Sequence, residues 1–269
     1  MARTIQLEVP EGNLTKTLAG FCADLLNTGK LEALLVPLEL PDRTSVVPAL
    51  VTDSTRLDSA RFLAPIMPVN TARVISDMTK VTPSSKKIGV VLRNCEIRAL
   101  LELVKLRQAS LENIILIGID CPGTYTVNDY TGRIAQGESP EETILQGFLK
   151  GEEDPDVRQS CAICSYPLAQ NADLTIELMG HDIEKSIAIT AATDSGEALL
   201  EGTELPEDTA TEKRTKTIEE VLAKQADKRE KFFKENASRF KGVDQLMSVL
   251  SPCIRCYNCR TVCPACYCK

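Results

Sequence analysis

Apolar residues first recur at helical spacing and then gather in short unbroken runs. Leu14, Leu18, Phe21 and Leu25 fall on one face of a helix that Asn13 is placed to cap. Further along the chain, short apolar runs with branched side chains are typical of buried strands: residues 31–38, 87–92, 113–119, 171–179 and 186–192. The pattern therefore predicts helices and strands that alternate along much of the chain.

The clearest unit is a strand, a helix and a second strand. An amphipathic helix at residues 96–108 is expected between the strands at 87–92 and 113–119. Because a helical crossover joins parallel strands, we predict an α/β fold, a mostly parallel sheet with helices on its faces. The expected domain limits are 1–196 for this α/β domain, 197–250 for a charged linker and helix, and 251–269 for a C-terminal ferredoxin-like iron-sulfur segment.

The composition is that of a globular protein whose cysteines are kept reduced. The chain has 269 residues, and 43% of them are hydrophobic, which is enough for a substantial core. Its 11 cysteines gather at metal-ligand spacing and no apolar signal segment is visible, so we expect a cytoplasmic location. The longest apolar runs are too short to span a bilayer, so direct membrane insertion is not expected.

Charge and aromatic content argue against several functions. The formal net charge is −7, aromatic residues make up 4% of the chain and tryptophan is absent, so a nucleic-acid partner is not expected. No G-x-G-x-x-G follows a predicted strand, which disfavours an ordinary NAD dehydrogenase. The single histidine, His181, is expected in a surface loop without a role, and no catalytic residue is predicted.

The C-terminal cysteines give the strongest chemical signal in the sequence. They follow the spacing C-x2-C-x2-C-x3-C-P over Cys253, Cys256, Cys259, Cys263 and Pro264. In such a run three closely spaced thiolates hold one [4Fe-4S] cluster, and the fourth usually serves another cluster. We predict that the first three thiols hold a tail cluster, completed by one of Cys263, Cys266 or Cys268, a choice that the spacing leaves open. Structural zinc is the alternative, although zinc sites usually have a longer spacer between their cysteine pairs.

Four other thiols are expected to lie close together: Cys95, Cys121, Cys161 and Cys164. Cys95 and Cys121 each come just after a predicted strand, and ligands of open α/β sheets bind at the edge where the strands end. The number of these thiols matches the needs of one cubane, so we predict a second [4Fe-4S] cluster on them. The alternative is that they have separate roles, since a lone C-x2-C can also be a redox pair or half of a zinc site.

The start of the first predicted helix is a candidate anion site. It consists of Gly12, Asn13, Leu14 and Thr15. Free backbone N–H groups at a helix start can hold an anionic group such as a flavin pyrophosphate. An ordinary capped helix explains these residues equally well when they are taken alone.

In their order along the chain, these motifs resemble the beta-subunit family of coenzyme F-420-reducing hydrogenase and formate dehydrogenase. The resemblance rests on residues 93–100, which include Arg93, Asn94 and Cys95, on residues 117–121, on the Cys161 and Cys164 pair, and on the terminal cysteine run. It implies FAD and [4Fe-4S] clusters, with an inner cluster on the four thiols described above. It also implies that residues 12–15, Arg93 and Asn94 lie near the flavin.

The same resemblance implies partners. These are other oxidoreductase subunits carrying iron-sulfur clusters or flavin, together with a two-electron carrier that could be coenzyme F-420 or NAD(P)H. We therefore expect an electron-transfer subunit of a multisubunit oxidoreductase, of the hydrogenase, formate dehydrogenase or heterodisulfide reductase type, that relays electrons between FAD and two [4Fe-4S] clusters. A flavin-free iron-sulfur adaptor subunit and a zinc-stabilised assembly module are the alternatives.

Overall fold

The computed structural model describes residues 3–150, 152, 154–203, 205–206 and 211–266. Over these residues the chain forms one sheet of seven strands in the order β1-β7-β6-β5-β4-β2-β3. The strands are β1 (Arg3–Glu8), β2 (Ala33–Glu39), β3 (Val46–Val51), β4 (Ile88–Arg93), β5 (Ile114–Ile119), β6 (Leu174–Glu177) and β7 (Ser186–Ala191).

Helices connect the strands and extend the chain beyond the sheet. They are α1 (Leu14–Asn27), α2 (Thr71–Thr79), α3 (Asn94–Lys105), α4 (Val127–Ala135), α5 (Pro140–Lys150), α6 (Gln159–Ala162), α7 (Asp194–Leu200), α8 (Thr211–Asn236), α9 (Val243–Leu250) and α10 (Asn258–Val262). Short 3-10 segments complete the described elements: η1 (Pro10–Gly12), η2 (Ser54–Ser59) and η3 (Ala237–Phe240).

The sheet is parallel in its centre and antiparallel at both ends. Strands β2, β4, β5 and β6 pair in parallel, whereas β3 at one end and β7 and β1 at the other pair antiparallel. The predicted α/β class is confirmed, and helix α3 makes the expected crossover between β4 and β5. The predicted mostly parallel sheet is thus a mixed sheet whose parallel part lies in the middle.

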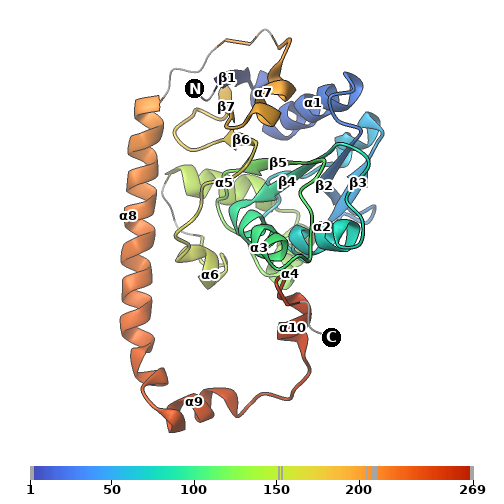
Figure 1. Ribbon diagram of the computed structural model, residues 1–269. Helices are drawn as coiled ribbons and strands as arrows, with labels where there is room; N and C mark the ends of the chain where they lie inside the picture. Colours follow the sequence, from blue (N-terminus) through green and yellow to red (C-terminus); the bar gives the residue numbers. More distant parts are fainter. Residues whose placement is uncertain (1–2, 151, 153, 204, 207–210, 267–269) are drawn as a thin grey trace.

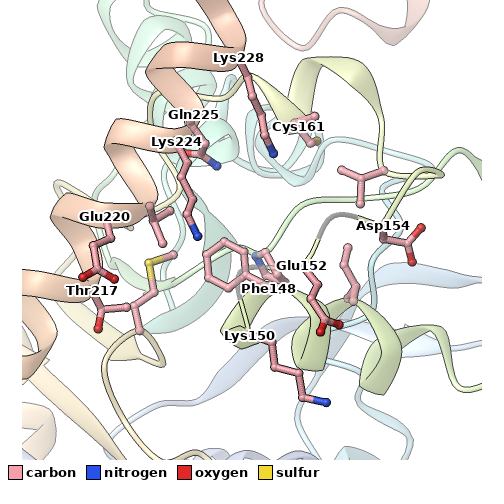
Figure 2. Close-up of a pocket in the computed structure, with 16 residues that line it drawn as sticks. Phe148, Lys150, Glu152, Asp154, Cys161, Thr217, Glu220, Lys224, Gln225 and Lys228 are labelled. Carbon is pink, nitrogen blue, oxygen red and sulfur yellow. The ribbon is translucent and has the colours of Figure 1, made fainter.

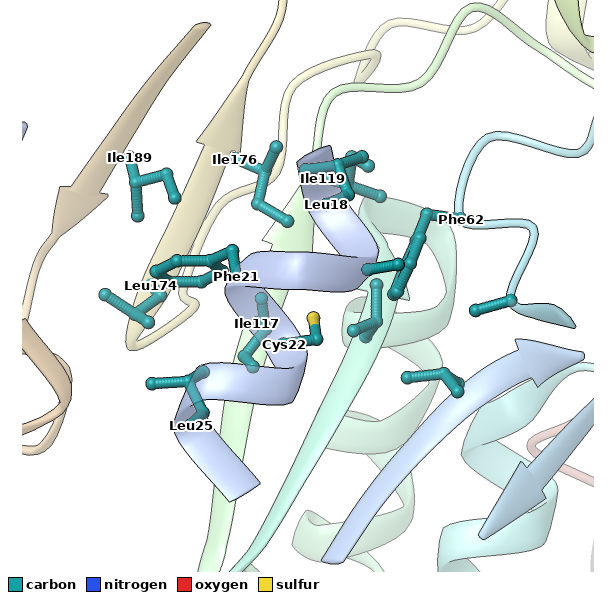
Figure 3. Close-up of a cluster of buried hydrophobic side chains, with 14 of the residues drawn as sticks. Leu18, Phe21, Cys22, Leu25, Phe62, Ile117, Ile119, Leu174, Ile176 and Ile189 are labelled. Carbon is teal, nitrogen blue, oxygen red and sulfur yellow. The ribbon is translucent and has the colours of Figure 1, made fainter. Parts of the chain in front are cut away.

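Successive residues of the central strands point to opposite faces, and each face packs its own layer of helix. On one face α1 lays Leu18, Phe21, Cys22 and Leu25 against β5 and β6 (Figure 3). On the other face α2 and α3 cover alternate residues of β4 and β5. Full burial of one such leucine or phenylalanine side chain stabilises the fold by roughly 1.5–3 kcal/mol. The two helical layers therefore hold the parallel strands, and the loops at their ends, in fixed positions.

Strands β1 and β3 and helix α4 are among the elements that were not expected from the sequence. In β1 only Ile5 is buried, and β3 contains Pro48 and buries only its two end residues, so neither strand is buried on both sides as the central strands are. Both lie at the ends of the sheet, where pairing is needed on one side only. Helix α4 begins at a side-chain cap from Thr126, in a stretch to which the sequence pattern assigned no helix or strand.

Helix α8 and the C-terminal residues form an arm outside the sheet region. In Figure 1, α8 runs alongside the sheet region and the chain then turns at α9. The arm returns so that the Arg73 guanidinium of α2 donates a hydrogen bond to the backbone carbonyl of Cys266, at 2.8 Å. Most described side chains of α9 and α10 are exposed.

The expected domain limits stay a prediction. Helix α7 spans residue 196, because its Leu199 and Leu200 are buried in the core beside β7. The described part of the C-terminal segment is a turn and the short helix α10, and a ferredoxin-like fold is not shown by it. Within the described residues no helix is both long enough and apolar enough to cross a membrane.

Candidate metal centre and neighbouring cleft

The carboxyl ends of β4 and β5 bring the first two candidate thiols to the same edge of the sheet. The two strands run in register, with Arg93 beside Ile119, the last residue of β5. Cys95 lies in the first turn of α3, two residues beyond the end of β4, and Cys121 lies two residues beyond β5. The strand-end position of both thiols is therefore confirmed by the parallel register.

A loop from later in the chain carries the other two thiols to this edge. The Cys121 N–H donates to the carbonyl of Pro167 at 2.8 Å, and the Arg158 N–H donates to the carbonyl of Thr124 at 2.9 Å. Between these two bonds the loop passes through Cys161 and Cys164, and the Thr124 hydroxyl lies 3.3 Å from the Cys161 sulfur. These two backbone hydrogen bonds hold the loop that carries Cys161 and Cys164 at the edge of the sheet where Cys95 and Cys121 lie.

Gly123 lets the two loops approach each other closely. Its φ is +117°, and a Cβ built at this position would lie 3.1 Å from Cγ1 of Val157 and 3.5 Å from Cβ of Cys161. A side chain here would be strained in its backbone and crowded against the second loop. The glycine therefore helps to set how near Cys161 comes to Cys121.

Arg93 supplies a positive charge beside three of the candidate thiols, Cys95, Cys121 and Cys161. Burial alone would lower the pKa of its guanidinium, but the charges of Cys121, Glu96, Cys95 and Cys161 together raise it. The side chain is fixed by donating to the carbonyls of Ile66, at 3.2 Å, and Ala64. A fixed guanidinium at this place stabilises negative charge that develops on the sulfurs.

Two of the four thiols, Cys95 and Cys121, have a raised pKa in these surroundings. Burial raises the pKa of Cys121 to about 11, against the opposing effect of Arg93. Cys95 is an exposed residue, but its thiol is packed against protein on one side. This burial, together with the charges of Cys121 and Glu96, raises the pKa of the thiol to about 12. Iron ligation requires thiolates, so a bound cluster would have to displace these protons.

The residues at this edge fit an iron-sulfur cluster in their chemistry. Four cysteines are the ligand number of one cubane, Arg93 offsets their charge, and the Tyr166 N–H donates to the Cys164 sulfur at 3.3 Å. In the part of the chain that the structure describes, no three histidine, cysteine or carboxylate side chains are spaced to hold one metal ion. Cluster ligation by these thiols stays a prediction, and it requires their side chains to turn toward one another.

Asn94 and Glu96 build the frame around this site. The Asn94 amide is buried, accepts from the Gln170 N–H at 3.2 Å and donates to the Tyr166 carbonyl at 3.4 Å. The Glu96 carboxylate accepts from the backbone N–H groups of Thr71, at 2.9 Å, and Arg93, at 3.0 Å. Asn94, which the resemblance placed near a flavin, therefore uses both ends of its amide to hold the loop that follows Cys164.

The residues expected at the flavin lie in two places. Asn13 and Thr15 line a cleft of 760 Å³ between α1, η2 and α5, whereas Arg93 lines only a crevice of 30 Å³. Leu14 is buried in the core, and Gly12 closes the 3-10 turn before α1. The larger cleft lies within the range of known cofactor pockets, and the crevice is far too small for one.

The lining of the larger cleft is acidic. Carboxylates exceed cations in it: Glu39, Asp58, Glu138, Glu141 and Glu142 against Lys16 and Arg61. The N–H of Lys16 is already capped by the Asn13 side chain, at 3.0 Å. The volume of the cleft thus fits a flavin, but its charge does not fit a pyrophosphate at the start of α1.

Glu141 is a functional candidate that the sequence analysis missed. Its carboxylate accepts from the Leu63 N–H at 3.2 Å and from the Thr15 hydroxyl at 3.4 Å. Burial raises its pKa, and the Leu63 bond and the charge of Arg61 oppose that rise. No sequence signal separates this glutamate from its exposed neighbour Glu142, since only the fold places one of them inward.

The cysteines of the C-terminal run are arranged by local turns. Arg255 and Tyr257 adopt left-handed backbone conformations, with φ of 55° and 59°, on either side of Cys256. Helix α10 then begins at Asn258, and Cys259 lies in its first turn. The thiols of Cys253, Cys256, Cys259 and Cys263 are exposed, and Cys266 is half-buried. Cys268 lies outside the described residues, so the tail cluster stays a prediction.

A second cavity separates α8 from the sheet region. It has a volume of 210 Å³, and its residues come from α5, the Cys161 loop and α8. Figure 2 shows Lys224, Gln225 and Lys228 of α8 on one side and Cys161 and Phe148 on the other.

His181, which was expected at the surface, is instead 8% exposed and therefore buried.

Comparison with known proteins gives a consistent picture. No known family model matches the chain. It is 24% identical to the F420-dependent formate dehydrogenase 1 subunit beta of Methanococcus maripaludis, over 91% of this chain and 70% of that protein. It is 26% identical to the F420-dependent formate dehydrogenase subunit beta of Methanocaldococcus jannaschii, over 82% of this chain and 64% of that protein.

The solved structures agree on the fold. A chain of the F420-reducing [NiFe] hydrogenase complex from Methanosarcina barkeri superposes with a TM-score of 0.64 at 12% sequence identity, covering 90% of this chain and 94% of that chain. The resemblance inferred from the motifs is therefore confirmed: over most of its length the chain is similar to beta subunits of F420-dependent formate dehydrogenases.

Proposed function

We propose that this chain is an electron-transfer subunit of a multisubunit oxidoreductase, carrying FAD and two [4Fe-4S] clusters. The observation that carries the proposal is that the chain segments bearing Cys95, Cys121, Cys161 and Cys164 are brought to one edge of the sheet beside Arg93. The similarity to beta subunits of formate dehydrogenase complexes supports the same role. The proposal assigns the inner cluster to these four thiols and the tail cluster to Cys253, Cys256 and Cys259 with one of the remaining C-terminal thiols.

The protein's own contribution is to hold thiolates and charge in place. When bound, a [4Fe-4S] cluster carries one electron at a time and a flavin exchanges two, which lets such a subunit join one-electron and two-electron carriers. Arg93 offsets the charge of the thiolates, and Asn94 and Glu96 hold the loops that carry them. The acidic net charge of −7 is consistent with protein partners and argues against nucleic acid.

The partners follow from the same proposal. They are oxidoreductase subunits with their own clusters or flavin, and a two-electron carrier for which coenzyme F-420 and NAD(P)H are the candidates. The proposal places the chain in the cytoplasm, where its thiols stay reduced.

A flavin-free iron-sulfur adaptor subunit is the second candidate. The observation that favours it is the excess of carboxylates in the 760 Å³ cleft where Asn13 and Thr15 lie. As a flavin-free adaptor the chain would still pass electrons between two clusters, but the two-electron step would take place in a partner subunit.

Analysis of anaerobically purified protein tests the proposal. We expect iron and acid-labile sulfide in equal amounts, about eight of each per chain for two cubanes, together with bound FAD. Iron and sulfide without flavin would select the adaptor function. A colourless protein that contains zinc and lacks sulfide would select a zinc-stabilised assembly module and overturn both electron-transfer functions.

A further inference from the structure

Arg214, near the start of helix α8, binds several groups of the sheet region. The Arg214 guanidinium donates to Oδ2 of Asp120 at 2.8 Å and to the carbonyl of Met179 at 2.9 Å, and its Nε lies 2.6 Å from Oε2 of Glu177. The Arg214 side chain is only 13% exposed, and that of Asp120 is 1% exposed. This is a desolvated, multiply bonded ion pair, unlike the exposed Lys234 and Glu230 pair farther along α8.

The backbone at Gly180 is shaped to admit this arginine. Gly180 has a φ of +83°, and a Cβ built there would lie 2.4 Å from the Cα and 2.9 Å from the backbone nitrogen of Arg214. Any other residue would push the first turns of α8 outward, because backbone atoms cannot yield as a flexible side chain does. The fold therefore leaves a place for α8 directly against the loop after β6.

Asp120 connects this attachment to the candidate metal centre. It is the residue immediately before Cys121, and its Oδ2 also accepts from the N–H groups of Leu178, at 3.0 Å, and Met179, at 3.1 Å. The carboxylate thus ties the end of β5 to the loop after β6, and Arg214 supplies the opposite charge. Removal of Arg214 leaves a buried carboxylate without its cation, which favours rearrangement of the segment that carries Cys121.

We propose that Arg214 is a positioning residue for the inner metal centre: it fixes the turn at Asp120 and thereby the thiol of Cys121. This inference rests on the proposed function, because it assigns Cys121 to a cluster. Docked in this way, α8 also covers the 210 Å³ cavity beside Cys161 and limits access of solvent to that side of the site. A partner subunit that moves α8 would then alter the inner centre.

Hydrogen exchange and iron release test the proposal in the full chain. The variants are made in a Cys256→Ser background, so that the inner cluster is the only complete one. Arg214→Ala removes the guanidinium group. Arg214→Lys keeps the positive charge but loses the planar set of N–H donors. Gly180→Ala displaces α8 without removing a charge. Lys216→Ala is the matched control, since Lys216 is an exposed cation of the same helix.

We expect Arg214→Ala and Gly180→Ala to raise amide exchange both in α8 and at residues 119–121 and 178–180. We also expect ferrous chelators to withdraw iron from these two variants at least several-fold faster, with an altered EPR signal of the remaining cluster. Arg214→Lys should be intermediate, and Lys216→Ala should match the parent protein in all three measurements.

Two results would overturn the inference. Exchange that rises in α8 alone, with iron release and the EPR signal unchanged, would make Arg214 a simple attachment of the helix. Unchanged amide exchange at residues 119–121 in Arg214→Ala would show that the attachment of α8 has no influence on the turn that carries Cys121. A parent protein without iron would refute the proposed function instead, and the exchange at residues 119–121 would still decide whether Arg214 fixes that turn.

Discussion

The thiols at the edge of the sheet and the thiols of the C-terminal run are organised by different parts of the chain. Cys95, Cys121 and the Cys161 loop come from segments far apart in sequence, and backbone hydrogen bonds from Cys121 to Pro167 and from Arg158 to Thr124 bring them together. The C-terminal thiols are neighbours in sequence and depend on local turns such as those at Arg255 and Tyr257. The first set therefore depends on the whole fold, and the second set depends on its own spacing.

Because of this difference, variants at the two places should differ in whether they change the stability of the domain as well as metal binding. A change at the sheet edge should affect both the packing of the domain and the inner centre, because the same loops serve both. A change in the exposed C-terminal run should affect only the tail cluster. Each of the following predictions tests that separation.

The largest expected effect is that of Cys121→Ser. We expect loss of the inner cluster, seen as a decrease of about four iron atoms per chain, because a hydroxyl is a poor substitute for the thiolate ligand. Iron and sulfide analysis with EPR of the reduced protein measures it. Cys22→Ala is the control, since Cys22 is a buried residue of α1 in the core, and its loss should leave the iron content unchanged. Full iron content in Cys121→Ser would remove Cys121 from the ligand set.

Cys256→Ser should abolish the tail cluster and spare the inner one. We expect the EPR signal of one cluster to disappear, while the free energy of unfolding of the sheet region changes by less than about 0.5 kcal/mol, as for other exposed positions. Urea denaturation followed by circular dichroism measures that free energy. Loss of flavin or of the inner cluster in this variant would contradict the independence of the two sites.

Asn94→Ala should destabilise the domain by roughly 1–2 kcal/mol. The substitution removes two hydrogen bonds and leaves the N–H of Gln170 and the carbonyl of Tyr166 without their buried partner. Chemical denaturation of the variant measures the change in the free energy of unfolding. Asn128→Ala is the matched control, because Asn128 is exposed on α4 and should change this free energy by at most about 0.5 kcal/mol. Equal stability of the two variants would show that Asn94 does not hold the loop.

Glu141→Gln should give the smallest effect, and one that depends on pH. Because burial raises the pKa of Glu141 in the folded chain, the folded state holds this proton more tightly than the unfolded chain does. The stabilising contribution of the protonated carboxyl is complete below the unfolded pKa of about 4.3 and is lost as pH rises toward the folded pKa.

The glutamine variant should lack this part of the pH dependence. Urea denaturation at a series of pH values above 4 compares it with the parent protein. Glu142→Gln, an exposed neighbour, should keep the parent slope. If the free energy of unfolding of Glu141→Gln fell with rising pH as steeply as that of the parent protein, another group would be the cause of the pH dependence.

The sequence predicted the central part of the fold because the strands there are buried on both sides. Every residue of β5 is buried, so its run of isoleucine and leucine is easily recognised. Strand β1 is half-exposed and β3 contains Pro48, and their pairing at the sheet ends is decided by neighbours that are distant in sequence. Local pattern cannot supply that information.

The strand-end position of two candidate thiols could be predicted from the sequence, but the residues around them could not. The position of Cys95 and Cys121 after two apolar strands was sufficient to place them at one edge. Arg214 has no distinguishing signal, because it is one charge among many on α8. Asp120 does carry one: it is a charged residue directly after the all-apolar strand β5 and therefore required a buried partner.

The returning arm has a consequence for assembly. Arg73 holds the end of the described chain by a single hydrogen bond to Cys266, and such a bond contributes only about 1 kcal/mol. The segment that carries α9 and α10 follows α8, whose first turn is held by Arg214, so it stays tethered to the sheet region when that bond opens. Opening this bond would therefore release the described cysteine-bearing segment from α2 at little energetic cost, and the tether through α8 would let the segment return.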